Sequence, residues 1–60
     1  MLYHDLMNIG DNNNFGVLLL RLVAKADHHN LALLRSAFPN AVQVLEYWRA
    51  TGDYLELPYD

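Results

Sequence analysis

Three stretches of the chain carry apolar residues at helical spacing, and short polar breaks separate them. The first stretch, over about 15–26, has a broad apolar face made of Phe15, Leu18, Leu19, Leu22, Val23 and Ala26. The second, over about 28–37, has an inner row of Leu31, Leu34 and Phe38. The third, over about 40–51, repeats Ala41, Val44, Leu45 and Trp48. Residues spaced by three and four lie on one side of an α-helix, so the pattern predicts three helices.

Residues that favour helix ends stand at the predicted boundaries. Asn13 or Asn14 can begin the first helix and Asp27 the second, because these side chains accept hydrogen bonds from the free amides of a first turn. Pro39 disfavours helical geometry at the residue before it and suits the first turn of the third helix. Gly52 is a typical C-terminal cap for that helix.

The fold class predicted from this pattern is all-α, within a single small domain. Residues 1–14 are expected to form an N-terminal arm with a short additional helix over about 1–9. Residues 15–52 form the helical core, and residues 53–60 form an extended acidic tail.

The apolar content exceeds what so short a chain is expected to bury by itself. The 60 residues are 53% hydrophobic and 18% charged, and small domains have much surface for their volume. Val17, Leu20 and Ala24 lie off the main face of the first helix, and Val42 and Tyr47 form a second strip on the third. Stripes of exposed apolar residues are typical of interfaces, so these five residues predict a homo-oligomeric helical bundle.

Charge and missing residue types argue against several classes of protein. Four Lys and Arg against seven Asp and Glu give a net charge of −3, whereas nucleic-acid binders neutralise phosphates with basic side chains. Without cysteine, neither a disulfide scaffold nor a thiolate zinc site can form. The apolar run over 17–20 is far shorter than the ~20 residues of a membrane span. We therefore expect a cytoplasmic protein that does not contact membranes.

The sequence shows no constellation typical of catalysis or of metal binding. Its carboxylates are dispersed, and Ser36 and Thr51 belong to no nucleophile motif, so we expect neither enzymatic activity nor a cofactor. His28 and His29 are adjacent, and adjacent helical side chains point about 100° apart. We expect these histidines to begin a helix and to be solvated, without a metal.

Basic and aromatic residues provide one candidate binding site. Arg21 and Lys25 are four residues apart on a polar edge, and two copies of the chain would gather four such charges around a symmetry axis. Aromatic rings can stack on bases. The predicted site for an anionic, nucleotide-type ligand comprises Arg21, Lys25, Arg35, Tyr3, Tyr47 and Tyr54. The alternative is that Arg21 and Lys25 are the solvated edge of an apolar helix, with Lys25 complementing the helix dipole.

One set of residues between positions 15 and 52 resembles a known pattern: Phe15-Gly16, Lys25-Ala26-Asp27, Asn30, Leu34, Phe38-Pro39, Val42, Tyr47-Trp48 and Gly52. The set is similar to that of short helical proteins encoded by bacteriophages and prophages. This resemblance implies a non-catalytic counter-defence protein in the host cytoplasm. Such a protein would act by stoichiometric binding, either sequestering a nucleotide-type immune signal or blocking a bacterial immune protein.

Two other function classes fit the same predicted helices. A structural adaptor would use the apolar stripes to bind a larger phage or host protein. A helix-turn-helix DNA-binding regulator has helices of comparable length. Its recognition helix would be the one over about 40–51, which carries Arg49 as its single cation, so the regulator is the less favoured of the two.

Overall fold

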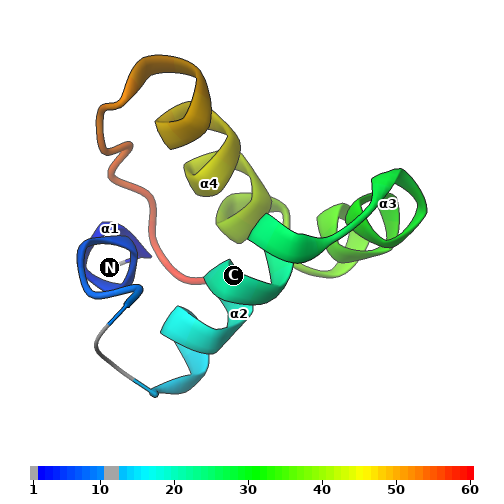
Figure 1. Cartoon of the computed structure of the whole chain (residues 1–60), viewed down its shortest axis with the longest axis horizontal. Helices are drawn as coiled ribbons and strands as arrows, with labels where there is room; N and C mark the ends of the chain where they lie inside the picture. Colours follow the sequence, from blue (N-terminus) through cyan, green and yellow to red (C-terminus); the bar gives the residue numbers. More distant parts are fainter. Residues whose placement is uncertain (1, 11–12) are drawn as a thin grey trace.

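A computed structural model describes residues 2–10 and 13–60, and the regular structure in these ranges is helical throughout. The helices are α1 (Leu2–Met7), α2 (Phe15–Lys25), α3 (His28–Ala37) and α4 (Pro39–Thr51), shown in Figure 1. The three principal helices agree with the predicted ranges to within a residue at each end, and α1 is shorter than predicted. The all-α fold class is confirmed, while self-association stays a prediction.

Side-chain and glycine caps fix the helix boundaries as predicted. Asn14 Oδ1 accepts a hydrogen bond of 2.8 Å from the amide of Val17 at the start of α2. Asp27 Oδ1 accepts one of 2.8 Å from the amide of Asn30 at the start of α3. Gly52 ends α4 with a φ of 77°, in the left-handed region that favours glycine.

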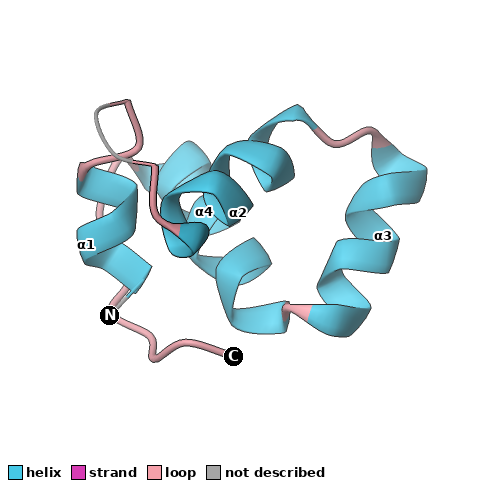
Figure 2. Ribbon diagram, turned by 90° about the horizontal axis from the view of Figure 1, so that it is seen from below, coloured by secondary structure: helices cyan, strands magenta, loops and turns pink. Residues whose placement is uncertain are grey.

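The hydrophobic core lies between α1, α2 and α4, and α3 stands to one side (Figures 1 and 2). The buried apolar side chains come from these three helices: Leu2, Leu6, Val17, Leu19, Leu20, Val23, Ala41, Val42, Val44 and Leu45. α3 has no buried residue, although Leu31 and Leu34 are half-buried against the core. The α1 residues Leu2 and Leu6 are nearly inaccessible, so the N-terminal segment is part of the core and not a separate arm.

Three residues predicted for the oligomer interface lie inside the chain's own core. Val17, Leu20 and Val42 each have no exposed surface in a single copy, so the prediction that they contact another copy is wrong. Of the other two predicted interface residues, Ala24 is half-buried and Tyr47 is 39% exposed. Residues off the main predicted face are buried because both α1 and α4 pack against α2, which gives that helix a wide inner face.

The inner face of α2 is rotated from the predicted one towards Gly16. Phe15, Leu18 and Leu22, predicted to face the core, are 70%, 47% and 54% exposed. The buried Asp5 side chain of α1 packs directly against Gly16, where a Cβ atom would overlap its carboxylate. The missing side chain therefore lets α1 approach α2 on this side, and the opposite side of α2 is left to solvent.

The tail, residues 53–60, returns across the helices and connects to α1 (Figure 1). Leu57 packs against the core, and its carbonyl accepts a hydrogen bond of 3.3 Å from the amide of Leu2. The Tyr59 hydroxyl donates to Asp5 Oδ2 at 2.7 Å. A buried carboxylate needs such donors, so the tail stabilises Asp5 in the position where it contacts Gly16.

The end of the tail also caps α4. Phe38, the residue before α4, offers no side-chain cap, and Pro39 begins the helix as predicted. Asp60 replaces the missing cap from 20 residues further along the chain: its carboxylate accepts hydrogen bonds from the amides of Asn40 at 2.7 Å and Ala41 at 3.0 Å. A carboxylate at a helix N-terminus also complements the helix dipole. The tail therefore joins α1 to the start of α4.

The contact between Tyr59 and Asp5 predicts a loss of stability at alkaline pH. The hydrogen bond to Asp5 raises the pKa of Tyr59 above its ordinary value, so the folded state favours the neutral phenol. This contribution is complete below about pH 10, where an unfolded tyrosine titrates, and is lost as the pH rises through the higher folded value. Urea unfolding should therefore show a steeper decline above about pH 10 for the wild type than for Tyr59→Phe. Tyr54→Phe, which changes an exposed tyrosine of the same tail, should follow the wild type; equal declines for all three chains would contradict the prediction.

Candidate binding surface on α2 and α3

The six residues predicted to bind an anionic ligand do not form one site within a single copy. They are spread over four helices and the tail: Tyr3 on α1, Arg21 and Lys25 on α2, Arg35 on α3, Tyr47 on α4 and Tyr54 beyond it. α1 and α3 lie on opposite sides of the molecule in both views (Figures 1 and 2). Tyr3 and Arg35 are therefore far apart, and a site that combines them would need more than one copy.

Arg35 is engaged with α4. Its Nη1 and Nη2 donate to Glu46 Oε1 at 2.7 Å and Oε2 at 2.8 Å, a bidentate pair that links α3 to α4. The hydrogen bonds from Arg35 lower the pKa of Glu46, and those to Glu46 raise the pKa of Arg35. The guanidinium is thus paired with a carboxylate in a single copy, and its part in the predicted anion site stays a prediction.

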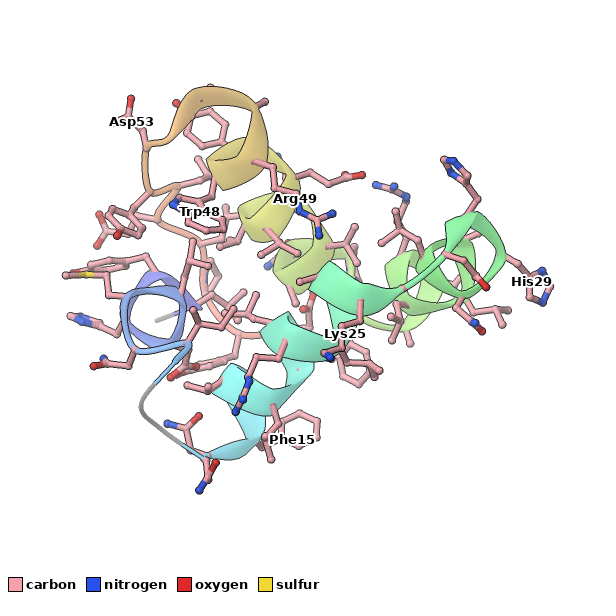
Figure 3. The ribbon with its side chains drawn as sticks, viewed as in Figure 1. Phe15, Lys25, His29, Trp48, Arg49 and Asp53 are labelled. Carbon is pink, nitrogen blue, oxygen red and sulfur yellow. The ribbon has the colours of Figure 1, made fainter. Side chains whose placement is uncertain are left out.

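The other Lys and Arg residues are Arg49 on α4 and the pair Arg21 and Lys25 on the exposed face of α2. The Arg49 guanidinium donates to the carbonyl of Ala24 and so connects α4 to the end of α2 (Figure 3). Arg21 and Lys25 are exposed, and neither forms an ion pair with a residue in the described part of the chain. These two side chains are the positive charges that a partner can use.

A groove lies between the C-terminal part of α2 and the inner side of α3. Its volume is about 390 Å³, and it is lined by Leu22, Lys25, Ala26, Asp27, Asn30, Leu33 and Leu34. Most of these side chains are apolar, and Lys25 and Asp27 contribute one charge of each sign. The volume is within the range of sites that take small molecules or single side chains of a partner.

Exposed apolar side chains extend from this groove along the outside of α2. Leu22 and Leu33 line the groove and are 54% and 58% exposed. Leu18 and Phe15 continue from Leu22 at helical spacing, and Figure 3 shows Phe15 at the end of α2 away from Lys25. We define the α2–α3 surface as Phe15, Leu18, Leu22 and Leu33 with the groove, and with Arg21 and Lys25 among them.

The sequence held a signal for this surface that the apolar pattern hid. Arg21 and Lys25 mark the side of α2 that must face solvent. Leu18 is three residues before Arg21, and Leu22 is three residues before Lys25. Since α2 is apolar nearly all round, the positions of these two charges were better guides to its outer face than the count of apolar residues.

The histidine and threonine side chains lie at helix ends. His28 and His29 are the exposed first residues of α3, and His29 points away from the other helices in Figure 3. Thr51 Oγ1 donates to the carbonyl of Tyr47 and accepts from the amide of Asp53, so it completes the last turn of α4. Within the described ranges, no three His, Cys, Asp or Glu residues gather where a metal ion could bind. No helix in those ranges is both long and apolar enough to span a membrane.

No protein-family model matches the chain, and no curated protein or solved structure matches it either. The resemblance to phage-encoded helical proteins therefore stays a prediction. The function has to be argued from the α2–α3 surface and from the charges on it.

Proposed function

We propose that this chain is a non-catalytic binding protein that acts by stoichiometric contact through the α2–α3 surface. The observation that supports this most directly is the exposure of Phe15, Leu18, Leu22 and Leu33 around one groove, in a chain whose core is already filled by other residues. Apolar residues gathered in this way are typical of protein interaction sites, whereas scattered single ones are ordinary.

The chemistry of the surface indicates what kind of partner it binds. Leu18 and Leu22 alternate with Arg21 and Lys25 on the outer face of α2, and the two cations have no acidic partner within the described part of the chain. A complementary partner carries an apolar stripe with acidic residues beside it. The amphipathic helix of a larger protein has this form, and such helices bind in apolar grooves of this kind.

The proposed partner is a bacterial immune protein, because the phage resemblance implies a counter-defence role. Binding of this kind would block the immune protein in proportion to copy number, in the host cytoplasm and without turnover. Sequestration of a nucleotide-type signal is the second candidate, favoured by the size of the groove and by Lys25 beside it. The mainly apolar lining and the engagement of Arg35 with Glu46 support the protein partner over the nucleotide.

The two other classes of protein differ from this proposal in separate ways. A structural adaptor would use the same α2–α3 surface on a phage or host structural protein, so the identity of the partner distinguishes it. A DNA-binding regulator would read bases from α4, whose Arg49 is occupied by the carbonyl of Ala24. The net charge of −3 also opposes the approach of this chain to phosphates.

A plaque assay with single substitutions tests the proposal. The chain is expressed in bacteria that carry defined immune systems, and the plating efficiency of a sensitive phage is measured. We expect the wild type to restore plaques against one of these systems and Leu33→Glu to lose the effect, since a carboxylate would be buried at the contact. Met7→Glu is the matched control, because Met7 is equally exposed (57%) but lies on α1.

The same cells distinguish the blocking of an immune protein from the sequestration of a small molecule. Blocking requires a complex of the chain with the immune protein in a fixed ratio, which native mass spectrometry of the co-purified proteins would detect. A chain that restores plaques and carries an ultraviolet-absorbing small molecule would favour sequestration instead. Plaques restored equally by Leu33→Glu, or by no form of the chain, would contradict the proposed function.

A further inference from the structure

The α2–α3 surface has a feature that an ordinary docking surface does not need. The groove is lined by one cation and one anion, Lys25 and Asp27, that are two residues apart in sequence. Asp27 Oδ1 accepts the capping hydrogen bond from Asn30, and Oδ2 makes no ion pair with a residue of the described ranges. Both charges are exposed and open to a partner.

Such a surface is complementary to itself. In a two-fold interface the same patch meets its own copy in reverse, so a residue i contacts j while j contacts i. Two copies joined across the α2–α3 surface bring Lys25 of each protomer towards the partner's Asp27, and the exposed leucines of one copy towards those of the other. A single two-fold contact would therefore form two Lys25–Asp27 pairs and cover the exposed apolar side chains of both copies.

The exposed apolar area is sufficient for a small dimer. Phe15, Leu18, Leu22 and Leu33 together expose on the order of 400 Å² per copy, since a fully exposed phenylalanine presents about 200 Å² and a leucine somewhat less. A standard interface covers roughly 800 Å² per partner, of which a little more than half is apolar. The polar remainder is available from Arg21, Lys25, Asp27 and Asn30 around the same surface.

We propose that, in the free protein, a second copy of this chain covers the α2–α3 surface in a two-fold dimer with reciprocal Lys25–Asp27 contacts. This inference rests on the surface of the proposed function and adds its regulation. Self-association and target binding compete for the same residues. The dimer is then an inactive form of the protein. An immune protein can bind the α2–α3 surface of one copy only after it displaces the second copy. The predicted homo-oligomer is thereby moved to a surface that differs from the predicted one.

Sedimentation equilibrium of the purified chain, without any target, tests this inference. At micromolar concentration we expect a particle of twice the 6.9 kDa chain mass. Leu22→Glu and Leu33→Glu should each raise the dissociation constant more than about 30-fold, as expected for central interface residues. Both positions are exposed in the single copy, so the helical circular dichroism spectrum should be unchanged. Met7→Glu on α1 should dimerise as the wild type does.

Charge variants test the reciprocal contact itself. Lys25→Gln and Asp27→Asn should each weaken the dimer by about threefold to tenfold, since two exposed ion pairs are lost. The asparagine keeps the cap of α3, so its effect is on association and not on folding. The double variant should be no weaker than either single one, because each substitution already removes both pairs.

The inference and the proposed function can fail separately. A particle of single-chain mass, or a dimer that Leu22→Glu and Leu33→Glu leave intact, would overturn the two-fold arrangement whatever the plaque assay shows. So would a double variant whose loss is the sum of the two single losses. A dimer that dissociates as described, in cells where no immune system is blocked, would support the arrangement and contradict the proposed function.

Discussion

Gly16→Ala is expected to lower the free energy of unfolding by about 2 kcal/mol. The new methyl group would overlap the buried carboxylate of Asp5 and crowd the ring of Tyr59. Relieving this overlap moves Asp5 away from the Tyr59 hydroxyl, and overpacking together with a weakened hydrogen bond costs about 3 kcal/mol. Alanine regains up to about 1 kcal/mol through its higher helix propensity, so the overlap outweighs the gain.

Thermal unfolding followed by circular dichroism would measure this effect. For a chain of this size, the expected loss corresponds to a fall in melting temperature of roughly 10 °C. Gly10→Ala is the matched control, because a Cβ atom at Gly10 meets nothing within 4 Å and Gly10 does not have a positive φ. If the melting temperature of Gly16→Ala equalled or exceeded that of the wild type, this result would contradict the close contact between α1 and α2.

Leu20→Ala is expected to leave much of the chain unfolded at room temperature. Leu20 has no exposed surface, and removing a fully buried leucine side chain costs roughly 2 to 5 kcal/mol. Domains have about 0.05 to 0.15 kcal/mol of stability per residue, so this single cavity removes a large part of the total. Urea titration would show the loss as a lower midpoint or as an incomplete folded baseline.

This substitution also distinguishes the core position of Leu20 from the interface position predicted by the sequence. If Leu20 lay between two copies, its replacement would weaken association and leave the folded chain intact. Met7→Ala is the control for side-chain loss on the surface: at 57% exposure, and away from the α2–α3 surface, it should change stability by less than about 0.5 kcal/mol. A Leu20→Ala chain as stable as Met7→Ala would restore the interface interpretation.

The parts of the fold that could be predicted are those fixed by neighbouring residues. Asn14 and Asp27 cap the helices that follow them within three residues, and Gly52 ends α4 by its own conformation. Helix ends of this kind depend on local hydrogen bonds and on φ preferences, which the sequence carries directly. The order and lengths of the helices could therefore be predicted from the sequence alone.

Which face of α2 is directed towards the core could not be predicted in the same way. Its apolar residues cover nearly the whole circumference, so the period of the pattern does not select one face. The selection comes from Asp5 against Gly16 and from Tyr59, which contacts Asp5 across 54 residues of sequence. No local pattern indicates that contact, so the sequence analysis assigns the core residues Val17 and Leu20 of α2 to an interface.

The candidate site was predictable to a similar extent. Their spacing of four residues identifies Arg21 and Lys25 as a pair, and both are exposed on one face. The sequence also assigns Arg35 to the site, because its partner Glu46 is 11 residues away on another helix and nothing in the spacing indicates the pair. Individual charges could be read from the sequence, whereas their neutralisation depended on how α3 packs on α4.

The hydrogen bond between Tyr59 and Asp5 joins the two ends of the described chain across 54 residues of sequence, so contacts between distant parts of the sequence close the folded molecule almost into a ring. Closing a long loop costs entropy before its contacts repay that cost, which makes these contacts late events on the folding pathway. The same contacts are the natural place for the first local opening of the native state. Fluctuations of the molecule should therefore begin where its ends meet, between α1 and the start of α4, and leave the groove between α2 and α3 in place for binding.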